Sequence, residues 1–539
     1  MKPSKETTRK PAKAETKHPT KMRPDAKQTN DRIASRHKKT NNTSQTAVDV
    51  ATRNGTSADL EPARAIPVYP AFPRTDAGNA ELFARGFAKI LRFDHRRGHW
   101  LVWRGHWWAR DENELVLQAA KKIARYRQQY SATINDNEIA ELEENWAIRS
   151  ESRSRLEAML KLAQSEHPLS DPGTDWDADP WLLGLANGVV DLRTGLLRPG
   201  KQADKITMHT DVLFDPTAKA PRWEQFLNEI FGGNQELIDY VQRAVGYSLT
   251  GDVSEQVIFL AYGTGANGKS TFLEVLRHVF GVYAYNLPFS AFELKARSAI
   301  PNEIAALSGK RFVTAIETNE SAELNEGRIK ALTGSDPITA RFLYHEYFTF
   351  IPTSKYWLAF NHKPKVSDDS PGFWRRVRLI PFLQRFAANQ ADPDLLDRLK
   401  AEAPGIFNWA VAGALKWQKD GLLTAAIVVE ASESYREESD LLKEFIDDRL
   451  VVDSSARVAA ADLWKEYVAW AASNHERPLD RKTFAQKMQM RGFTKVRLGH
   501  DRIWTWLGLG LKRNIPVADP IIDLIDSAGG CGRQNANCS

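Results

Sequence analysis

The segment Gly263-Thr264-Gly265-Ala266-Asn267-Gly268-Lys269-Ser270, followed by Thr271, decides the fold. It matches the phosphate-binding loop pattern at every fixed position. The apolar run 257–260 before it is typical of a buried strand, and residues 271–280 after it have helical spacing. Glycines let backbone N–H groups turn toward phosphate oxygens, and the start of the helix adds partial positive charge. The sequence therefore predicts a strand–loop–helix unit that binds a nucleoside triphosphate.

Two side chains of this loop have predicted roles with ATP and Mg²⁺. Lys269 is expected to bridge the β- and γ-phosphates, and the Ser270 hydroxyl to ligate Mg²⁺. The apolar run 312–316 predicts a second strand, and acidic residues follow it. Of these, Glu317 is the first choice and Glu320 the second for holding Mg²⁺ or polarising the attacking water. The sequence does not divide these two roles.

Polar side chains also flank two further predicted strands. The run 356–360 ends in Asn361, whose amide is suited to bind the γ-phosphate or the attacking water; the alternative is that it only caps a turn. Arg375 and Arg376 precede another apolar strand. In a ring, such arginines can reach the nucleotide of the neighbouring subunit, a contribution of ~10³–10⁵ in rate. The alternative is a sheet edge held by salt bridges.

Composition places the chain among soluble globular proteins. It has 539 residues, of which 42% are hydrophobic and 26% charged, and no apolar run approaches the ~20 residues of a membrane span. Its two cysteines, Cys531 and Cys538, lie near the end, which excludes a disulfide scaffold or a cysteine-bound zinc in the body. We therefore expect an intracellular protein with no membrane partner.

The pattern along the chain predicts six segments. Residues 1–40 contain 13 Lys or Arg and 4 Asp or Glu, so this end either touches nucleic-acid phosphates or is a solvated extension without a partner. The segments are a disordered basic tail (1–65), a mainly helical N-terminal domain (66–214), an α/β ATPase domain (215–390), a helical connector (391–440), a winged-helix-like domain (441–512) and a flexible tail (513–539).

The 441–510 segment reads as three helices and a two-stranded wing. Asp480 is a suitable N-cap for a basic helix. A basic helix followed by a basic wing suits contact with DNA phosphates, and the alternative is a winged helix that binds protein. The candidate DNA-binding residues are Arg481, Lys482, Lys487, Lys495, Arg497 and Arg502.

The order of the motifs carries a family resemblance. The segments GTGANGKST, AIETNE, RIKALTGSDPITARF, KYWLAFNHKP and FWRRVRLIPF follow one another. This series resembles superfamily 3 helicases and, more narrowly, the phage and plasmid primase–helicase family related to the poxvirus primase–helicase. Residues 79–213 resemble the helical domain that precedes the motor in that family. The resemblance covers about 80–510.

The resemblance implies a multidomain fold with an α-rich N-terminal domain, an α/β P-loop motor of the AAA+ type and a C-terminal winged helix. By position, 263–270 become the Walker A loop, Glu317 the Walker B acid and Asn361 the sensor. Arg375 or Arg376 becomes the arginine finger. Walker B often shows two adjacent acids in superfamily 3, whereas Thr318 follows Glu317 here.

The resemblance also places a DNA-gripping hairpin between residues 330 and 351. Its strands are read at 338–343 and 347–351, and Arg341 and His345 supply positive or polar groups for phosphates near the tip. Relatives often have a clearer lysine there.

The resulting functional hypothesis is an ATP-dependent DNA helicase of phage, plasmid or mobile-element replication. It would form a ring, usually hexameric, on single-stranded and forked DNA in the cytoplasm of a bacterial host, with a separate primase or replication initiator as a further partner. The alternative is an ATP-dependent initiator or loader that does not unwind. A small-molecule kinase would not need the sensor, the arginines or a winged helix. Primase activity is not supported, because the acidic residues 175, 177 and 179 read as a solvated turn.

Overall fold

The computed structural model describes residues 66–294, 301–317, 322–344, 346–367, 370–387, 389, 392–476 and 478–512. The predicted tails 1–65 and 513–539 lie outside the described residues, and so do the candidate site residues Glu320 and His345.

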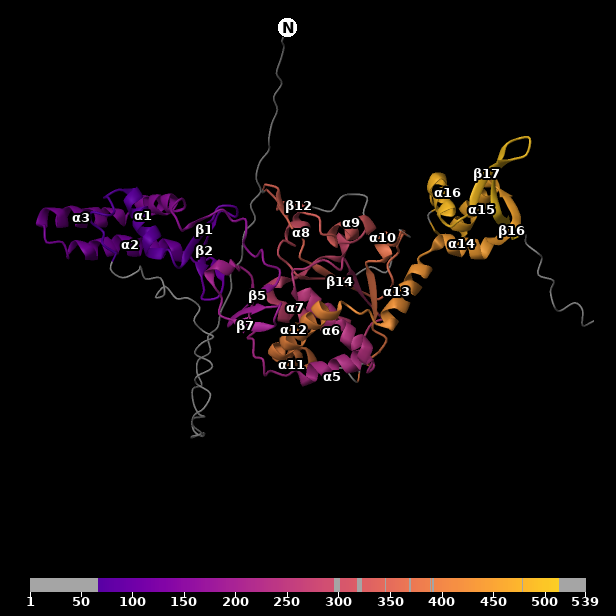
Figure 1. Ribbon diagram of the computed structural model, residues 1–539, viewed down its shortest axis with the longest axis horizontal. Helices are drawn as coiled ribbons and strands as arrows, with labels where there is room; N and C mark the ends of the chain where they lie inside the picture. Colours follow the sequence, from indigo (N-terminus) through magenta and orange to yellow (C-terminus); the bar gives the residue numbers. More distant parts are fainter. Residues whose placement is uncertain are drawn as a thin grey trace, which may run out of the picture. The chain divides into compact units, whose positions relative to one another are not determined.

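The first part of the described chain combines four helices with a small sheet (Figure 1). The helices are α1 (Asp76–Phe87), α2 (Leu115–Ser131), α3 (Asn137–Ser150) and α4 (Arg153–Ala163). The sheet has the order β3-β2-β1-β4, with strands β1 (Leu91–Asp94), β2 (His99–Trp103), β3 (Trp108–Arg110) and β4 (Ser170–Asp171). Strands β2 and β3 form a hairpin around Gly105, in which Trp103 pairs with Trp108 in an antiparallel ladder.

A second small sheet follows, which the expectation of a mainly helical segment 66–214 did not include, although helical residues outnumber strand residues there. It has the order β7-β6-β5-β8, with strands β5 (Leu182–Leu185), β6 (Gly188–Asp191), β7 (Leu196–Arg198) and β8 (His209–Thr210). The strands of both sheets are two to five residues long. So short a run shows little alternation, and helix-forming residues dominate the sequence pattern around it.

The central sheet is five-stranded and parallel throughout, in the order β10-β11-β14-β9-β15. Its strands are β9 (Ile258–Tyr262), β10 (Ala284–Asn286), β11 (Phe312–Ile316), β14 (Lys355–Phe360) and β15 (Val377–Pro381). Four of them are the predicted apolar runs, which confirms an α/β sheet; the three-residue β10 was not predicted. Every residue of β14 is buried, as expected for a central strand covered on both faces. The segments between strands contain α8 (Pro301–Ala305), α9 (Glu326–Leu332), the hairpin β12 (Ile338–Ala340) and β13 (Phe348–Phe350), and α10 (Pro371–Trp374).

One hydrophobic core joins this sheet to elements on both sides of it in the sequence. The helices are α5 (Pro221–Ile230), α6 (Gln235–Leu249), α7 (Lys269–Phe280), α11 (Leu395–Ala401), α12 (Ala403–Asp420) and α13 (Ala426–Glu438). The core contains Leu183 of β5, Val190 of β6, Trp357 of β14 and Phe407 of α12. This core therefore contains residues from both sides of the boundaries expected at 214/215 and 390/391.

Helices α6 and α12 are in backbone contact within this core (Figure 1). A Cβ atom on Gly246 would lie 2.0 Å from the Ala414 nitrogen, and one on Gly413 would lie 2.0 Å from the Gln242 oxygen. Only glycine permits so close an approach of two helices.

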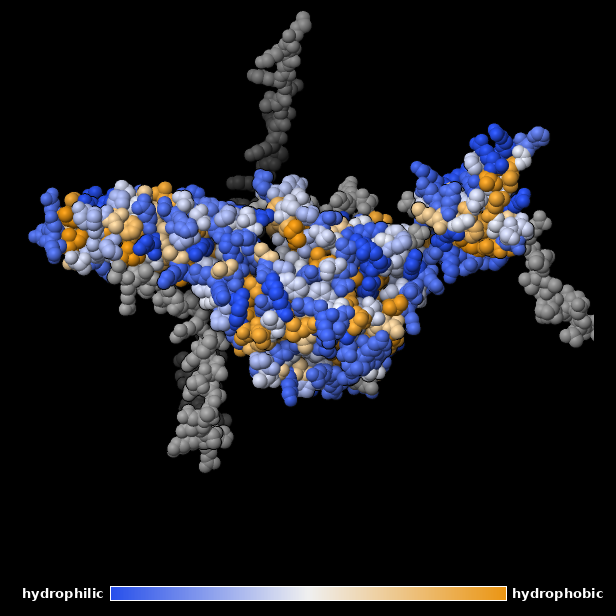
Figure 2. Space-filling view, viewed as in Figure 1, coloured by the Kyte–Doolittle hydropathy of each residue, from blue (hydrophilic) through white to orange (hydrophobic). Residues whose placement is uncertain are grey.

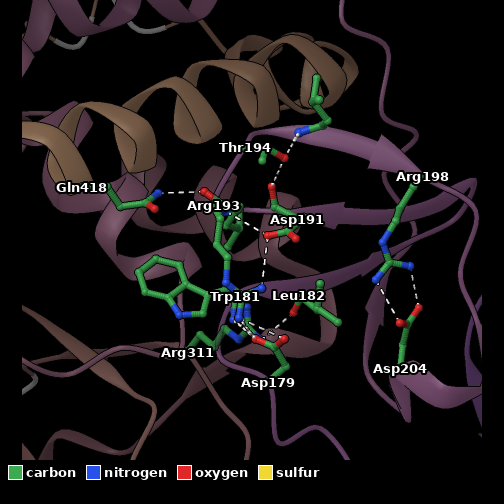
Figure 3. A network of polar contacts seen from close by, with 12 residues as sticks. Asp179, Trp181, Leu182, Asp191, Arg193, Thr194, Arg198, Asp204, Arg311 and Gln418 are labelled. Carbon is green, nitrogen blue, oxygen red and sulfur yellow. Dashed lines mark hydrogen bonds and ion pairs between the residues drawn. The ribbon is translucent and has the colours of Figure 1, made fainter.

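Two buried cations fasten the amino-terminal edge of the central sheet. Arg311, directly before β11, donates to the Leu249 and Leu182 carbonyls at 2.8 Å each, and its guanidinium lies 4.8 Å from the Tyr283 ring centre. Lys355, the first residue of β14, donates to the Thr250 and Asp252 carbonyls. The carbonyls of Leu249, Thr250 and Asp252 belong to the end of α6 and the turn after it, where positive charge is stabilised by the helix dipole. Figure 3 shows Arg311 beside Leu182, so this pair also ties β5 to the central sheet.

The C-terminal elements form a compact group with a core of its own. Their order is α14 (Leu441–Arg449), β16 (Leu450–Ala459), α15 (Ala460–Ser473), α16 (Arg481–Met490), β17 (Thr494–Leu498) and β18 (Ile503–Leu511). The expected pair of strands, β17 and β18, is present, but β16 adds a third strand in the order β16-β18-β17. The hydrophobic stripe on this group in Figure 2 matches its exposed apolar side chains, which include Val451, Val452 and Ile503.

Among the described residues, no helix has both the length and the apolar character needed to cross a membrane.

Candidate functional site at the edge of the central sheet

The glycine-rich loop 263–268 leaves the carboxyl end of β9, which lies between β14 and β15. Its backbone requires glycine at two positions. Gly268 has φ +83°, and a Cβ there would lie 2.5 Å from the Ile230 side chain. A Cβ on Gly263 would lie 2.4 Å from the Phe382 carbonyl oxygen. The loop is thus packed against α5 and the end of β15, and helix α7 begins directly after it at Lys269.

The Lys269 ammonium folds back into this loop and is only 5% exposed. Its Nζ donates to the Gly263 carbonyl at 2.6 Å, to Asn267 Oδ1 at 3.0 Å and to Asn361 Oδ1 at 3.1 Å. All three acceptors are neutral. Burial therefore lowers the pKa of Lys269 to about 8. The structure brings the predicted residues Lys269, Asn267 and Asn361 into direct contact, and the Asn267 amide also donates to the Phe382 carbonyl at 3.3 Å.

Glu317 lies beside Asn361 because β11 and β14 are neighbours in register. Ile316 pairs with Ala359, and the Glu317 amide donates to the Ala359 carbonyl at 2.8 Å. Burial raises the pKa of the Glu317 carboxyl, while hydrogen bonds from the His362 and Asn361 amides lower it. Its Oε1 atom is buried and has no hydrogen-bond partner within the described part of the chain. A buried carboxylate oxygen without a donor is costly, so it marks a place for a cation or a water.

The two predicted arginines lie at the opposite edge of the sheet and differ from each other. Arg376 is 9% exposed, and its guanidinium donates to Thr333 Oγ1 at 3.1 Å and to the Gly372 carbonyl. Arg375 is exposed and donates to Gln256 Oε1 at 2.6 Å. Of the two, only Arg375 has a guanidinium at the surface, so the finger assignment stays a prediction that now favours Arg375.

The hairpin β12–β13 is shorter than expected, and its wide tip is aromatic. Tyr344 is 96% exposed with φ +64°, and Tyr347 is 60% exposed. The guanidinium of the predicted residue Arg341 lies 4.7 Å from the Tyr347 ring centre. Phe342 and Phe348 stack with ring centres 5.8 Å apart. The predicted DNA contacts of this hairpin are Arg341 and His345, and the exposed Tyr344 and Tyr347, which were not predicted to contact DNA, adjoin the same turn.

In the C-terminal group, the wing strands carry a cluster of basic and aromatic side chains. Asp480 caps α16 as predicted, accepting from the Lys482 and Thr483 amides at 3.0 and 3.1 Å. Arg497 and Lys495 lie 4.9 and 5.3 Å from the Trp504 ring centre. Burial, and secondarily the charge of Arg481, lowers the pKa of Lys495. Two of the predicted DNA-binding residues, Lys495 and Arg497, thus lie beside Trp504, which is 45% exposed and was not predicted, and Arg481 is close enough to Lys495 to affect its pKa. Lys482 and Lys487 lie on α16, and Arg502 lies in the β17–β18 turn.

The acidic residues 175, 177 and 179 each have a partner in the same segment. Asp175 pairs with Lys205 at 2.7 Å, and Asp179 pairs with Arg193 at 2.9 Å (Figure 3). Asp177 accepts from the Thr207 amide at 2.6 Å. The segment was interpreted as a solvated turn, and the structure shows that each of its three carboxylates also has a partner within the chain.

Together these features define a multidomain α/β protein whose parallel sheet places Lys269, Asn361 and Glu317 at one edge. Comparisons with known proteins show which families it is similar to. Residues 80–232 match the family described as "D5 N terminal like", and residues 261–376 match a "Family of unknown function (DUF5906)". These matches, with the viral relatives described next, confirm the resemblance to the primase–helicase family of the phage and poxvirus D5 type.

The similar curated proteins are viral. "Putative helicase L207/L206" of Acanthamoeba polyphaga mimivirus is 30% identical over 326 residues, which are 56% of this chain and 34% of that protein. "Putative helicase 022R" of Frog virus 3 is 24% identical over 55% of this chain and 39% of its own length. "Putative primase C962R" of African swine fever virus is 24% identical over 55% of this chain and 34% of its own length. The chain thus spans about a third of these relatives, and they do not support the expected bacterial host.

A solved structure, the C-terminal region of NrS-1, is similar at 11% identity with a TM-score of 0.39, over 57% of this chain and 80% of that one.

Proposed function

We propose that this chain is an ATP-dependent DNA helicase of replication, which hydrolyses ATP at the subunit interfaces of a ring and moves along single-stranded DNA. The observation that carries the proposal is the buried Lys269 ammonium, held by three neutral acceptors in a glycine-rich loop at the carboxyl end of β9. Such an ammonium has given up most of its hydration without gaining a counter-charge. A triphosphate would supply that charge, and the N-terminus of α7 would add to its binding.

The residues around the loop fit Mg²⁺ as well. Glu317 Oε1 is buried without a hydrogen-bond partner among the described residues, and Ser270 is exposed on the first turn of α7. Carboxylate and hydroxyl oxygens are suitable ligands for Mg²⁺. Bound there, the ion would neutralise charge on the β- and γ-phosphates. Glu317 would orient or deprotonate the attacking water, and Asn361 would place its amide beside the terminal phosphate.

Two surfaces support DNA as the partner. The hairpin tip offers exposed Tyr344 and Tyr347 with Arg341 beside them, and single-stranded bases stack on such rings whatever their sequence. The wing offers Arg481, Lys495 and Arg497 for phosphates, in a group that we interpret as a winged helix. The names of the viral relatives agree with a role in replication.

The test compares Lys269→Ala and Glu317→Gln with the unchanged protein in ATP binding, ATP hydrolysis and fork unwinding. Lys269→Ala is expected to lose binding, hydrolysis and unwinding together. Glu317→Gln is expected to keep binding and to lose hydrolysis at least a hundredfold, because only the acid that acts on water is removed.

Two other results would contradict this proposal. DNA-stimulated hydrolysis without strand separation by the unchanged protein would favour the loader alternative. Full hydrolysis by Lys269→Ala would refute the nucleotide site.

A further inference from the structure

The turn between β1 and β2 lies beside the hairpin β12–β13. It contains three exposed basic residues, His95, Arg96 and Arg97. Nη2 of Arg96 donates to the Thr349 carbonyl of β13 at 2.8 Å. A contact between residues 253 positions apart in the sequence thus brings this turn to the hairpin that we expect to contact DNA.

Buried and packed groups fix the position of the β1–β2 turn. The fully buried Asp94 accepts from the Arg97 amide and from Arg97 Nη1 at 3.0 Å each. Trp107, directly before β3, stacks on His209 of β8 with ring centres 4.1 Å apart, which attaches the sheet of β1 to the sheet of β8. Strands β5 and β6 of that second sheet share a hydrophobic core with the central sheet. A continuous series of packed elements therefore places the turn.

The hairpin β12–β13 has one apolar and one polar face, because side chains alternate along a strand. On one face, Phe350 packs against the core of the central sheet. On the other face, Thr339 and Thr349 are exposed, and their Oγ1 atoms lie 3.1 Å apart. The exposed Arg341 and Tyr347 follow at the tip ends of the two strands, in contact with each other. We call these four exposed residues the polar face.

Arg96 is located at the outer edge of β13, next to the polar face. Thr349 and Thr339 are opposite each other in an antiparallel pair, and the Thr349 carbonyl points away from β12, where Arg96 binds it. Two residues of extended chain separate Thr349 from Tyr347, which is roughly 7 Å. One strand of nucleic acid can therefore contact both the Arg96 guanidinium and the Tyr347 ring.

The Arg96 guanidinium can bind a phosphate without giving up this contact. Within the described residues it donates to Thr349 through Nη2, which leaves the donors of Nε and Nη1 for another molecule. Paired N–H donors on a planar guanidinium are suited to phosphate. At the tip, the formal charges of Arg341 and Glu346 cancel, so Arg96 adds the positive charge that a polyanion requires.

We propose that Arg96 belongs to the path of single-stranded DNA, where its guanidinium contacts a backbone phosphate next to the base that stacks on Tyr347. The inference rests on the proposed function. It extends the DNA contact from the hairpin to a turn of the N-terminal sheet, so two separate parts of the chain build the surface that holds the strand.

The test measures binding of a fluorescein-labelled oligothymidylate to the full chain by anisotropy over a series of salt concentrations. Loss of one phosphate contact on a single strand lowers the slope of log affinity against log salt by about 0.7. Arg96→Gln is therefore expected to show this smaller slope and to bind about fivefold more weakly at about 0.1 M salt. Arg96→Lys keeps the charge and should keep the slope.

The matched control is Arg153→Gln, which removes an exposed guanidinium from α4, where it is paired with Glu157 at 2.7 Å. It lowers the net charge by the same amount and should change neither the affinity nor the slope. Because Arg96 and Arg153 are both exposed, the melting temperature should be unchanged in both variants.

The outcomes separate this inference from the proposed function. Normal oligothymidylate binding by both Tyr344→Ala and Arg341→Ala would refute the proposed DNA contact of the hairpin itself. Weakened binding by these two variants, together with unchanged affinity and slope in Arg96→Gln, would overturn only the present inference. Weaker binding by Arg96→Gln with an unchanged slope would show that Arg96 only positions the hairpin, and would also overturn it.

Discussion

Raising the pH from about 7 to about 9 is expected to weaken ATP binding about tenfold through Lys269 alone. Burial lowers the pKa of this lysine to about 8 in the nucleotide-free protein, so the ammonium is charged below pH 8 and loses its proton above it. A triphosphate stabilises the charged form and returns the pKa toward or above its ordinary value of 10.5. Binding above pH 8 must therefore include proton uptake, and its affinity falls as pH rises.

The magnitude follows from these two values. With a pKa of about 8 in the free protein and at least 10.5 in the complex, the protein should take up about 0.7 proton per nucleotide at pH 8.5 and almost none at pH 6.5. The nucleotide's own phosphate titrates near pH 6, well below this window.

Isothermal titration calorimetry measures both quantities. Titrations in two buffers of different ionisation enthalpy give the proton uptake, and a pH series gives the affinity. Lys269→Gln, which has no titrating group at this position, should bind weakly at every pH without the decline. An unchanged affinity between pH 7 and 9 in the unaltered protein, without buffer-dependent heat, would refute the reasoning.

Three further predictions concern packing and the hairpin β12–β13. Gly413→Ala should lower the free energy of unfolding, measured by urea titration, by about 1–3 kcal/mol, because its Cβ would lie 2.0 Å from the Gln242 oxygen. The control is Gly327→Ala in α9, where the nearest atom is 3.6 Å away, and it should be neutral or slightly stabilising. Arg311→Met should cost roughly 2–6 kcal/mol by leaving two buried carbonyls without donors. In contrast, Arg193→Met removes a half-exposed ion pair and should lower the free energy of unfolding by less than about 1 kcal/mol. Equal losses in the two variants would contradict the role of Arg311 as the buried donor to these carbonyls. Tyr344→Ala should weaken single-stranded DNA binding by about 1–3 kcal/mol in a fluorescence anisotropy assay while Tyr344→Phe binds normally; a loss in both would exclude base stacking as the cause.

Much of the central sheet could be predicted because its strands are continuous apolar runs bounded by turn residues. The loop 263–271 and the positions of Glu317 and Asn361 follow from the rule that parallel strands end at one edge. Their mutual contact could not be derived without the strand order, which places β14 between β9 and β11. The order is set by packing between residues about 100 positions apart, and no local pattern records it.

Other features were missed for different physical reasons. Strands of two to three residues, such as β4 and β10, give no periodic signal. Arg311 and Lys355 look like surface residues in the sequence, yet both are buried because helix-end carbonyls satisfy them. Arg375 is exposed and Arg376 is buried, although they are neighbours in the turn before β15, because the tertiary fold orients their side chains differently. The exposure of Tyr344 and Trp504 likewise depends on tertiary packing.

The shared core of β5, β6, the central sheet and α12 has a practical consequence for making fragments of this protein. A truncation that starts at residue 215 removes Leu183 and Val190 and strips one wall from the interior that Trp357 and Phe407 help to fill. A fragment of the family-matched segment 80–232 has the converse defect, since it presents Trp223 and Phe226 of α5 to water. The shortest piece expected to express in folded form therefore runs from before Trp181 to beyond Val428, and family boundaries are a poor guide to where the chain can be cut.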